Sequence, residues 1–258
     1  MNTLIKKSDF IQSLEKGLNV ISVFNSSNQQ LTLTQVAKAV DLTRANARRV
    51  LLTLEHLHYV SSIDGKLFRL TPKVLCLGYS YLSSIPFREF AIPFMEALAA
   101  KVNESCSMAV LDEGEIVYVA RVQTKRIMSI SLAVGSRLPV HATSMGAVLM
   151  ASMEPKEVDR AVRGYRFEVY TPHTIRNKRK YIERINEVRK KGWAISDQEL
   201  EIGIRSIACP LKDKNGKTIA ALNISGHTSR VTAKEMTTNY LPTLKETVSK
   251  IEEALHKL

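Results

Sequence analysis

The sequence lacks several features that would assign it to other classes of protein. No run approaches 18 consecutive apolar residues, so we expect no transmembrane helix. Charged residues occupy the N-terminal stretch where a signal peptide would need an apolar segment, so we expect no export. The three cysteines are too few and too widely spaced for a disulfide framework or a zinc site, and they fit a reducing cytoplasm: Cys76, Cys106 and Cys209.

Acidic residues are also scarce, because 25 Asp and Glu stand against 37 Lys and Arg and give a net charge of +12. This excess favours an anionic partner, nucleic acid first and acidic metabolites second. The remaining composition is that of an ordinary globular protein, with 45% hydrophobic and 24% charged residues. A chain of 258 residues is long enough for one large domain or two smaller ones.

Residues 1–71 predict a winged helix-turn-helix. Apolar spacing indicates helices at about 8–25, from Thr32 onward and at 44–58. Thr32 and Gln35 form a capping box, and Thr43 is a favourable N-cap for the third helix. Two short β-segments, 59–63 and 66–70, are joined by a tight turn and predict a hairpin. A linker helix follows over 72–86, with a proline at its first position and too many apolar residues to stand alone in water.

The third helix carries the residues expected to bind DNA. Its apolar stripe leaves arginines on the outward side of the first two turns, and arginine matches both phosphate oxygens and guanine edges. The hairpin adds two cations placed for adjacent phosphates. A solvated helix face is the alternative explanation for the arginines. The predicted DNA-binding residues are Thr43, Arg44, Ala45, Arg48, Arg49, Lys66 and Arg69.

Residues 87–258 predict an α+β domain with a mainly antiparallel sheet covered by helices. Expected helices lie at 87–102, 144–153 and 174–191, and a last one begins at a capping box formed by Thr232 and Glu235. We interpret the basic stretch 176–191 as a solvated amphipathic helix rather than a nucleic-acid site. The expected strands are 105–111, 115–122, 126–133, 193–197, 205–211 and 217–225.

Motifs along the whole chain resemble the IclR family of bacterial transcriptional regulators. In the N-terminal half they are the runs 11–18, 31–37, 42–49 and 67–72, and in the C-terminal half 143–146 and 197–208. Within the family, the runs 44–49, 118–122 and 126–129 resemble the subgroup that controls the β-ketoadipate pathway and related aromatic-acid catabolism. The resemblance implies a GAF-like effector-binding domain, a palindromic DNA operator and a homodimer or tetramer.

The resemblance also implies an effector pocket for a small carboxylate, possibly protocatechuate, p-hydroxybenzoate or β-ketoadipate. Backbone N–H groups at the start of the 144–153 helix would bind its carboxylate. Strand residues would donate from the other side, with serine at 206 where the family often has cysteine. Ser206 and Ser225 could instead be ordinary strand hydroxyls. The implied effector-binding residues are Ser144, Met145, Gly146, Ser196, Asp197, Ser206, Asn223 and Ser225.

A carboxylate effector also favours a nearby cation. Arg121, Arg126, Arg137 and His141 are the candidates, and Arg137 stands in a loop context that lets an arginine point inward. Arg205 could instead form a structural ion pair with a nearby glutamate, Glu199 or Glu201.

No cofactor, metal ligand or catalytic residue is predicted, because the chain contains no nucleophile elbow, P-loop or zinc-protease motif. Ser144 follows His141 by three residues, which is weak support for a catalytic pair. Two alternatives to a ligand-responsive regulator stay open. One is an enzyme acting on a small acid with an appended DNA-binding domain, and the other is a regulator that works through protein contacts alone.

Overall fold

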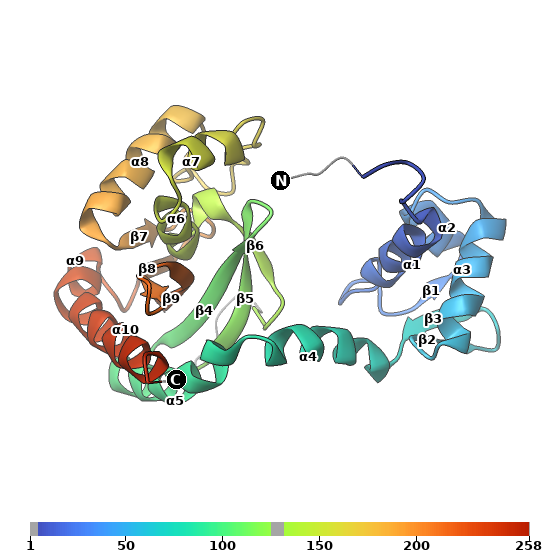
Figure 1. Cartoon of the computed structure of the whole chain (residues 1–258), viewed down its shortest axis with the longest axis horizontal. Coiled ribbons are helices and arrows are strands. Elements are labelled where there is room, and N and C mark those ends of the chain that lie inside the picture. The colour runs from blue at the N-terminus through green and yellow to red at the C-terminus, as the bar shows by residue number, and fades with distance from the viewer. Residues whose placement is uncertain (1–4, 125–131, 258) are drawn as a thin grey trace. The chain divides into compact units, whose positions relative to one another are not determined.

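The computed structural model describes residues 5–124 and 132–257, and it divides into two compact units, Met1–Ser84 and Ile85–Leu258 (Figure 1). Most of the predicted strand at 126–133, and Arg126 with it, lie outside the described residues. The predicted α+β architecture is confirmed. No helix in the described ranges is both long and apolar enough to cross a membrane.

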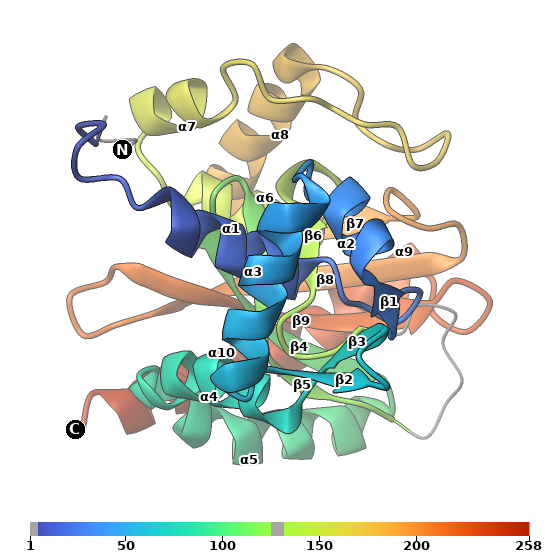
Figure 2. The ribbon, with the colours of Figure 1, turned by 90° about the vertical axis from the view of Figure 1, so that its right-hand side faces the viewer.

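Up to Leu70, the described part of the N-terminal unit forms three helices and a small antiparallel sheet (Figure 2). The hairpin predicted from the sequence is present, and its second strand also pairs with a two-residue strand that is too short to leave a periodic signal. The first helix is shorter than predicted, because residues 8–11 form a turn and irregular chain with exposed side chains and the helix ends at Ser22. The elements are α1 (Gln12–Ser22), β1 (Leu31–Thr32), α2 (Leu33–Ala39), α3 (Arg44–His56), β2 (Val60–Ile63) and β3 (Leu67–Leu70).

Local capping and a small core fix these helices. Thr32 and Gln35 form the predicted capping box, and the Thr43 hydroxyl accepts a hydrogen bond from the Asn46 N–H at 3.3 Å. The core gathers apolar side chains from all three helices and the sheet, including Val20, Val36, Leu51 and Phe68.

The predicted linker helix begins as a 3-10 turn at Pro72–Val74 and continues as α4 (Leu75–Ser83). None of its residues is buried, and the apolar side chains of Leu75 and Tyr79 are 74% and 71% exposed. Pro86 then occupies the first turn of the next helix, α5 (Pro86–Val102), where its missing N–H costs no hydrogen bond.

The described part of the C-terminal unit contains a six-stranded antiparallel sheet with the order β6-β5-β4-β9-β8-β7. The short β6 lies in a stretch where the sequence predicted only a loop. In chain order the strands are β4 (Ser105–Asp112), β5 (Glu115–Val122), β6 (Arg137–Pro139), β7 (Ala194–Asp197), β8 (Ile204–Lys212) and β9 (Thr218–His227).

Helices cover both faces of this sheet (Figure 1). On one face α6 (Ser144–Ala151) packs against the strands and against α8 (Lys178–Lys191). On the other, α5 packs with α10 (Leu241–Leu255). The chain reaches α10 through α9 (Ala233–Glu235), which begins at the predicted capping box, and a π-helical turn over Met236–Tyr240. One more helix, α7 (Pro155–Ala161), lies in a stretch for which the sequence pattern predicted no element.

Candidate DNA-binding surface and ligand cavity

The residues predicted to bind DNA all lie at exposed positions of the N-terminal unit. Arg44 and Arg48 form no ion pair with any residue in the described part of the chain, and the first turn of α3 carries no acidic side chain. The Thr43 hydroxyl caps α3 as an acceptor, so its own hydrogen can still be donated to a phosphate. The start of α3 therefore presents uncompensated positive charge.

The remaining predicted contacts come from the hairpin and from a later position of α3. Lys66 lies in the turn of the hairpin, and Arg69 donates from Nε to the Ser61 hydroxyl at 3.3 Å. Arg49 lies beside α1, where it lines a groove together with Lys16. Leu52, which also lies outside the apolar stripe, is 42% exposed.

In the C-terminal unit, a cavity of about 40 Å³ lies between the start of α6 and the face of the sheet. Two rows of polar side chains cross the sheet beneath it. The first, here called the serine row, follows the strand register from Ser196 through Ser206 and Ser225 to Ser105. The second, the arginine row, joins Asn223, Ser107 and Arg121 on three neighbouring strands.

The strand register explains why both rows face α6. Side chains alternate between the two faces of a strand, so residues two apart share a face, as Ser105 does with Ser107 and Asn223 with Ser225. Ser105 and Ser107 continue the two rows without lining the cavity, and the sequence did not single them out. The same alternation within the run Ser-Cys-Ser would have found them.

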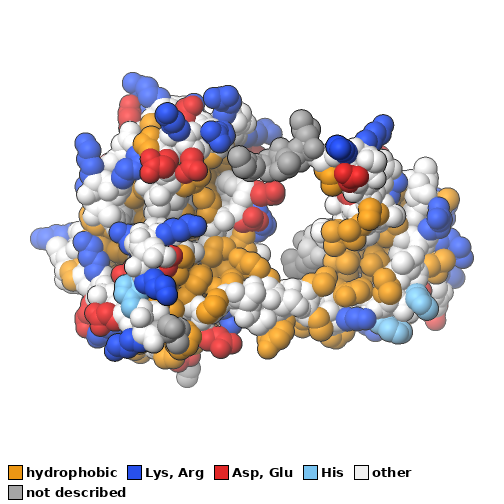
Figure 3. Space-filling model, in the orientation of Figure 1, with side chains coloured by type: hydrophobic (Ala, Val, Ile, Leu, Met, Phe, Trp, Pro, Cys, Tyr) orange, Lys and Arg blue, Asp and Glu red, His pale blue; other side chains and the backbone are white. Residues whose placement is uncertain are grey.

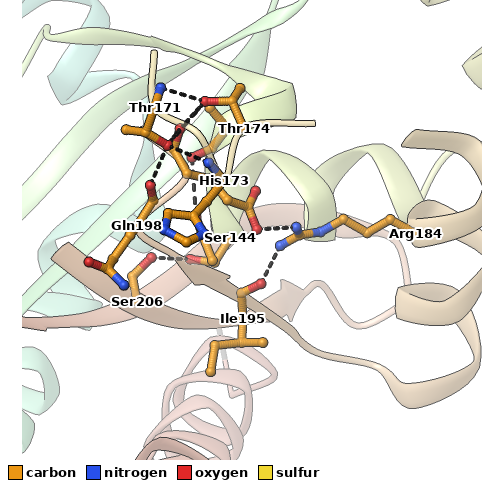
Figure 4. Close-up of polar contacts among 11 residues, drawn as sticks. Ser144, Thr171, His173, Thr174, Arg184, Ile195, Gln198 and Ser206 are labelled. Atoms are coloured by element: carbon orange, nitrogen blue, oxygen red, sulfur yellow. Dashed lines mark hydrogen bonds and ion pairs between the residues drawn. The ribbon is translucent and has the colours of Figure 1, made fainter. Parts of the chain in front are cut away.

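Hydrogen bonds connect α6 to the serine row and run along the arginine row. The Ser144 and Ser206 hydroxyls are 2.8 Å apart and join α6 to β8 (Figure 4). The Ser196 hydroxyl donates to the Ala142 carbonyl at 3.2 Å. The Asn223 amide accepts from the Ser107 N–H at 3.1 Å and donates to the Ser225 hydroxyl at 2.9 Å. Met145 is buried and lines the cavity with them.

Arg121 lies at the β5 end of the arginine row. Its Nη1 atom is 3.4 Å from the Ser107 hydroxyl, and its buried Nε atom has no hydrogen-bond partner. Burial lowers the pKa of this guanidinium and raises the pKa of the neighbouring Tyr118 to about 12. Arg121 was one of four candidate cations in the sequence, and the structure brings it to the cavity.

Three implied effector-binding residues do not reach the cavity. Arg137 is 40% exposed and forms ion pairs with Asp112 at 2.7 Å and Glu115 at 2.6 Å. Asp197 neighbours Ser196 on β7 and so points to the other face of the sheet, where it pairs with Arg205. Gly146 does not line the cavity, and its N–H donates to the Thr143 hydroxyl at 3.2 Å.

A network of buried polar contacts holds the turn at 198–203, which borders the cavity (Figure 4). The Thr171 hydroxyl donates to the Gln198 carbonyl and the Thr174 hydroxyl to the Glu199 carbonyl, both at 2.6 Å. Arg184 pairs with the buried Glu199 carboxylate and also donates to the Ile195 carbonyl. Arg205 pairs with Asp197 and donates to the Val231 carbonyl, so its partner is neither Glu199 nor Glu201.

His141 and Ser144 do not form a catalytic pair. The His141 ring is buried, with Nδ1 2.9 Å from the Tyr165 hydroxyl and Nε2 2.9 Å from the Glu168 carbonyl. Burial lowers the pKa of this imidazole below its ordinary value. Ser144 instead contacts Ser206. The arrangement therefore lacks the nucleophile–base contact that an acyl-transfer site needs.

A basic winged helix in one unit and a buried polar cavity in the other define a DNA-binding regulator with a ligand-sensing domain. The chain matches the IclR helix-turn-helix domain over residues 13–63 and the C-terminal domain of the bacterial transcriptional regulator IclR over residues 79–253. The chain belongs to the IclR family of bacterial transcriptional regulators.

Several proteins resemble the chain over most of its length. It is 40% identical over 237 residues to the Pca regulon regulatory protein of Pseudomonas putida, covering 92% of this chain and 81% of the relative. It is 35% identical over 252 residues to the p-hydroxybenzoate hydroxylase transcriptional activator of Acinetobacter baylyi, covering 96% and 93%. An IclR homolog from Microbacterium hydrocarbonoxydans, solved in complex with 4-hydroxybenzoate, is 25% identical with a TM-score of 0.82, covering 95% and 100%.

Proposed function

We propose that the protein controls an operon of aromatic-acid catabolism by binding a small aromatic carboxylic acid in the C-terminal cavity. The observation that carries this proposal is the pair of polar rows, ending in a partly buried arginine, that face α6 across the cavity. The similarity to the Pca and p-hydroxybenzoate regulators supports an aromatic acid. Protocatechuate, p-hydroxybenzoate and β-ketoadipate are the candidate effectors.

The size of the cavity suggests how the acid would act. A substituted benzene ring is larger than a space of about 40 Å³, so binding would require the cavity to widen. A ligand that binds the widened form more tightly shifts the protein toward it. This differential affinity would couple the acid to operator binding.

A thermal-shift screen tests the effector class. Protocatechuate, p-hydroxybenzoate, β-ketoadipate and glyoxylate are added to the full chain at increasing concentration. An acid that binds the native state adds about 2.7 kcal/mol of stability at 100 times its Kd. A matching shift in operator affinity would support regulation, whereas no shift with any acid would contradict the proposal.

On the DNA side, we propose that α3 reads a palindromic operator in the major groove and that the hairpin contacts the flanking phosphates. Arg44→Ala and Arg48→Ala should each weaken operator binding by about 1–3 kcal/mol. Both side chains are exposed and unpaired within the described residues, so the free energy of unfolding should change by less than ~0.5 kcal/mol. Unchanged operator affinity in both variants would remove α3 as the recognition helix.

We further propose that two chains pair through their N-terminal units, because a palindromic site requires symmetric subunits. Exposed apolar side chains of α1 and α4 support this, and Figure 3 shows hydrophobic side chains gathered on the surface of this unit. The family resemblance also allows a tetramer.

We also propose that the protein acts in the cytoplasm, without enzymatic activity, cofactor or membrane contact.

A further inference from the structure

One residue of β5 has no partner on the neighbouring strand β4. The register pairs Tyr118 and Ala120 with consecutive residues of β4, so Val119 between them is an extra residue and forms a β-bulge. A bulge leaves its extra residue unpaired, bends the strand and changes the direction of the side chains that follow. β5 therefore departs from regular strand geometry at Val119.

The bulge explains how two side chains of β5 reach the same side of the sheet. Tyr118 and Arg121 are three residues apart, and an odd separation places two side chains on opposite faces of a regular strand. The extra residue restores a common face, because their partners on β4, Ala109 and Ser107, are two residues apart. The direction of this part of β5 thus depends on the bulge.

The helix that follows the linker holds the carbonyl of the bulged residue. Arg88, in the first turn of α5, donates from Nε to the Val119 carbonyl at 2.8 Å. Its side chain forms no other hydrogen bond and no ion pair with the described residues. A hydrogen bond from a charged donor is stronger than one between neutral groups. This contact therefore ties the start of α5 to the bulge.

The same turn of α5 comes directly after the linker helix in the chain. α4 ends at Ser83 and α5 begins at Pro86, and the boundary between the two compact units falls between Ser84 and Ile85. A displacement of β5 at the bulge would act through Arg88 on the segment that leads to the DNA-binding unit.

We propose that the contact between Arg88 and Val119 couples the C-terminal unit to the linker, and that the bulge is the element whose arrangement a bound acid changes. The inference rests on the proposed function, in which a small acid controls operator binding. Coupling requires an element with two arrangements that differ in their affinity for the ligand. A bulge suits this role because pairing with the neighbouring strand does not fix its extra residue.

A thermodynamic cycle measures this coupling, with p-hydroxybenzoate and protocatechuate as the probes. Operator affinity is measured with and without saturating acid, and acid affinity with and without operator DNA, for the full wild-type chain and for Arg88→Met. The ratio of the two affinities is the coupling factor, which is the same in both directions and is typically about 5- to 150-fold. Arg88→Met should bind the acid and the operator separately, and its coupling factor should fall close to one.

Matched variants separate the hydrogen bond from the charge. Arg88→Gln can place its amide nitrogen where Arg88 has Nε, so it should keep most of the coupling. Arg88→Glu has nearly the same shape but offers only acceptors, so it should lose the coupling, and it replaces Arg88→Met if that variant does not fold. Lys101→Met is the control, because Lys101 is a cation of the same helix whose ion pair with Glu246 is exposed. It should keep the wild-type coupling factor.

Failure of this proposal is distinct from failure of the proposed function. If neither acid binds the wild-type chain or changes its operator affinity, the proposed function is wrong. If the wild-type chain responds and Arg88→Met responds with the same coupling factor, the contact does not carry the coupling. If Arg88→Met no longer binds the acid, the contact supports the acid site itself, and the proposal is equally overturned.

Discussion

At the scale of single residues, strand alternation decides which side chains reach the cavity. Asn223 and Ser225 could be assigned to one face from sequence alone, because they are two apart on one strand. Arg137 could not be assigned, because its partners Asp112 and Glu115 come from the β4–β5 hairpin, 22 to 25 residues earlier. The local sequence around a loop arginine does not show whether its side chain points into the domain or out to solvent.

Close packing around position 146 leaves room only for glycine. A Cβ atom at this position would lie 2.4 Å from the Val140 backbone and 2.6 Å from the Thr143 hydroxyl oxygen. Gly146→Ala should therefore destabilise the C-terminal unit by about 1–3 kcal/mol, since the backbone of Val140 cannot easily move aside. Thermal unfolding of the variant measures the loss.

Gly78→Ala is the matched control for this substitution. Gly78 is also inside a helix, but a Cβ there meets nothing within 4 Å. In the single chain, alanine at that position should be neutral or stabilising by about 0.5–1 kcal/mol, because it is the better helix former. Equal unfolding temperatures for the two variants would contradict the packing explanation.

The buried His141 predicts a pH dependence of stability. The Glu168 carbonyl can only accept, so Nε2 carries the hydrogen and Nδ1 accepts from the Tyr165 hydroxyl, which is the neutral form. Burial lowers the pKa in the folded state, so the unfolded chain binds a proton more readily. Its contribution to stability should be complete above the ordinary imidazole pKa and should fall as the pH drops below it.

Denaturant unfolding between pH 7.5 and pH 5.5 measures how the free energy of unfolding depends on pH. His141→Gln, which cannot titrate in this range, should reduce that dependence. The prediction fails if the variant retains the full pH dependence of the wild-type chain.

At the scale of elements, α4 is more exposed than its apolar sequence predicts. Its apolar content predicted packing, yet Leu75, Leu77, Tyr79 and Tyr81 are each 48% or more exposed in the single chain. Periodicity indicates that a helix forms and that one face avoids water. It does not indicate whether the same chain or a second copy covers that face.

Substituting this exposed face should separate the proposed dimer. Leu75 and Tyr79 are four residues apart and share one side of α4. The double variant Leu75→Glu, Tyr79→Glu should halve the sedimenting mass, or reduce a tetramer to a smaller species, and weaken operator binding. Val169→Glu, at an exposed apolar residue of the C-terminal unit, is the control. Identical masses for the variant and the control would place the interface elsewhere.

At the scale of the whole molecule, the division into two units predicts that sensing and DNA binding can be separated by mutation. Ser206→Leu should fill the cavity and remove a hydroxyl that faces α6, abolishing the response to the acid. Operator affinity in the absence of acid should be unchanged, because the recognition helix belongs to the other unit. Loss of operator binding in this variant would mean that the cavity supports the DNA-binding form directly.

The sequence by itself determined what depends on local spacing and chemistry. The capped helices, the hairpin, the strands 105–111 and 115–122 and the basic start of α3 all follow from periodicity, capping residues and turn residues within short windows. Its family motifs also identified the region around Ser144 and Ser206 before any contact between them was visible.

Only the tertiary structure decided which distant side chains meet. The serine row depends on the register of four strands, and Arg121 reaches the cavity only because β5 pairs with β4 beside Ser107. The same folding directs Arg137 outward to Asp112 and Glu115. Local sequence limits which residues can face a common side, but long-range strand pairing selects those that share one cavity.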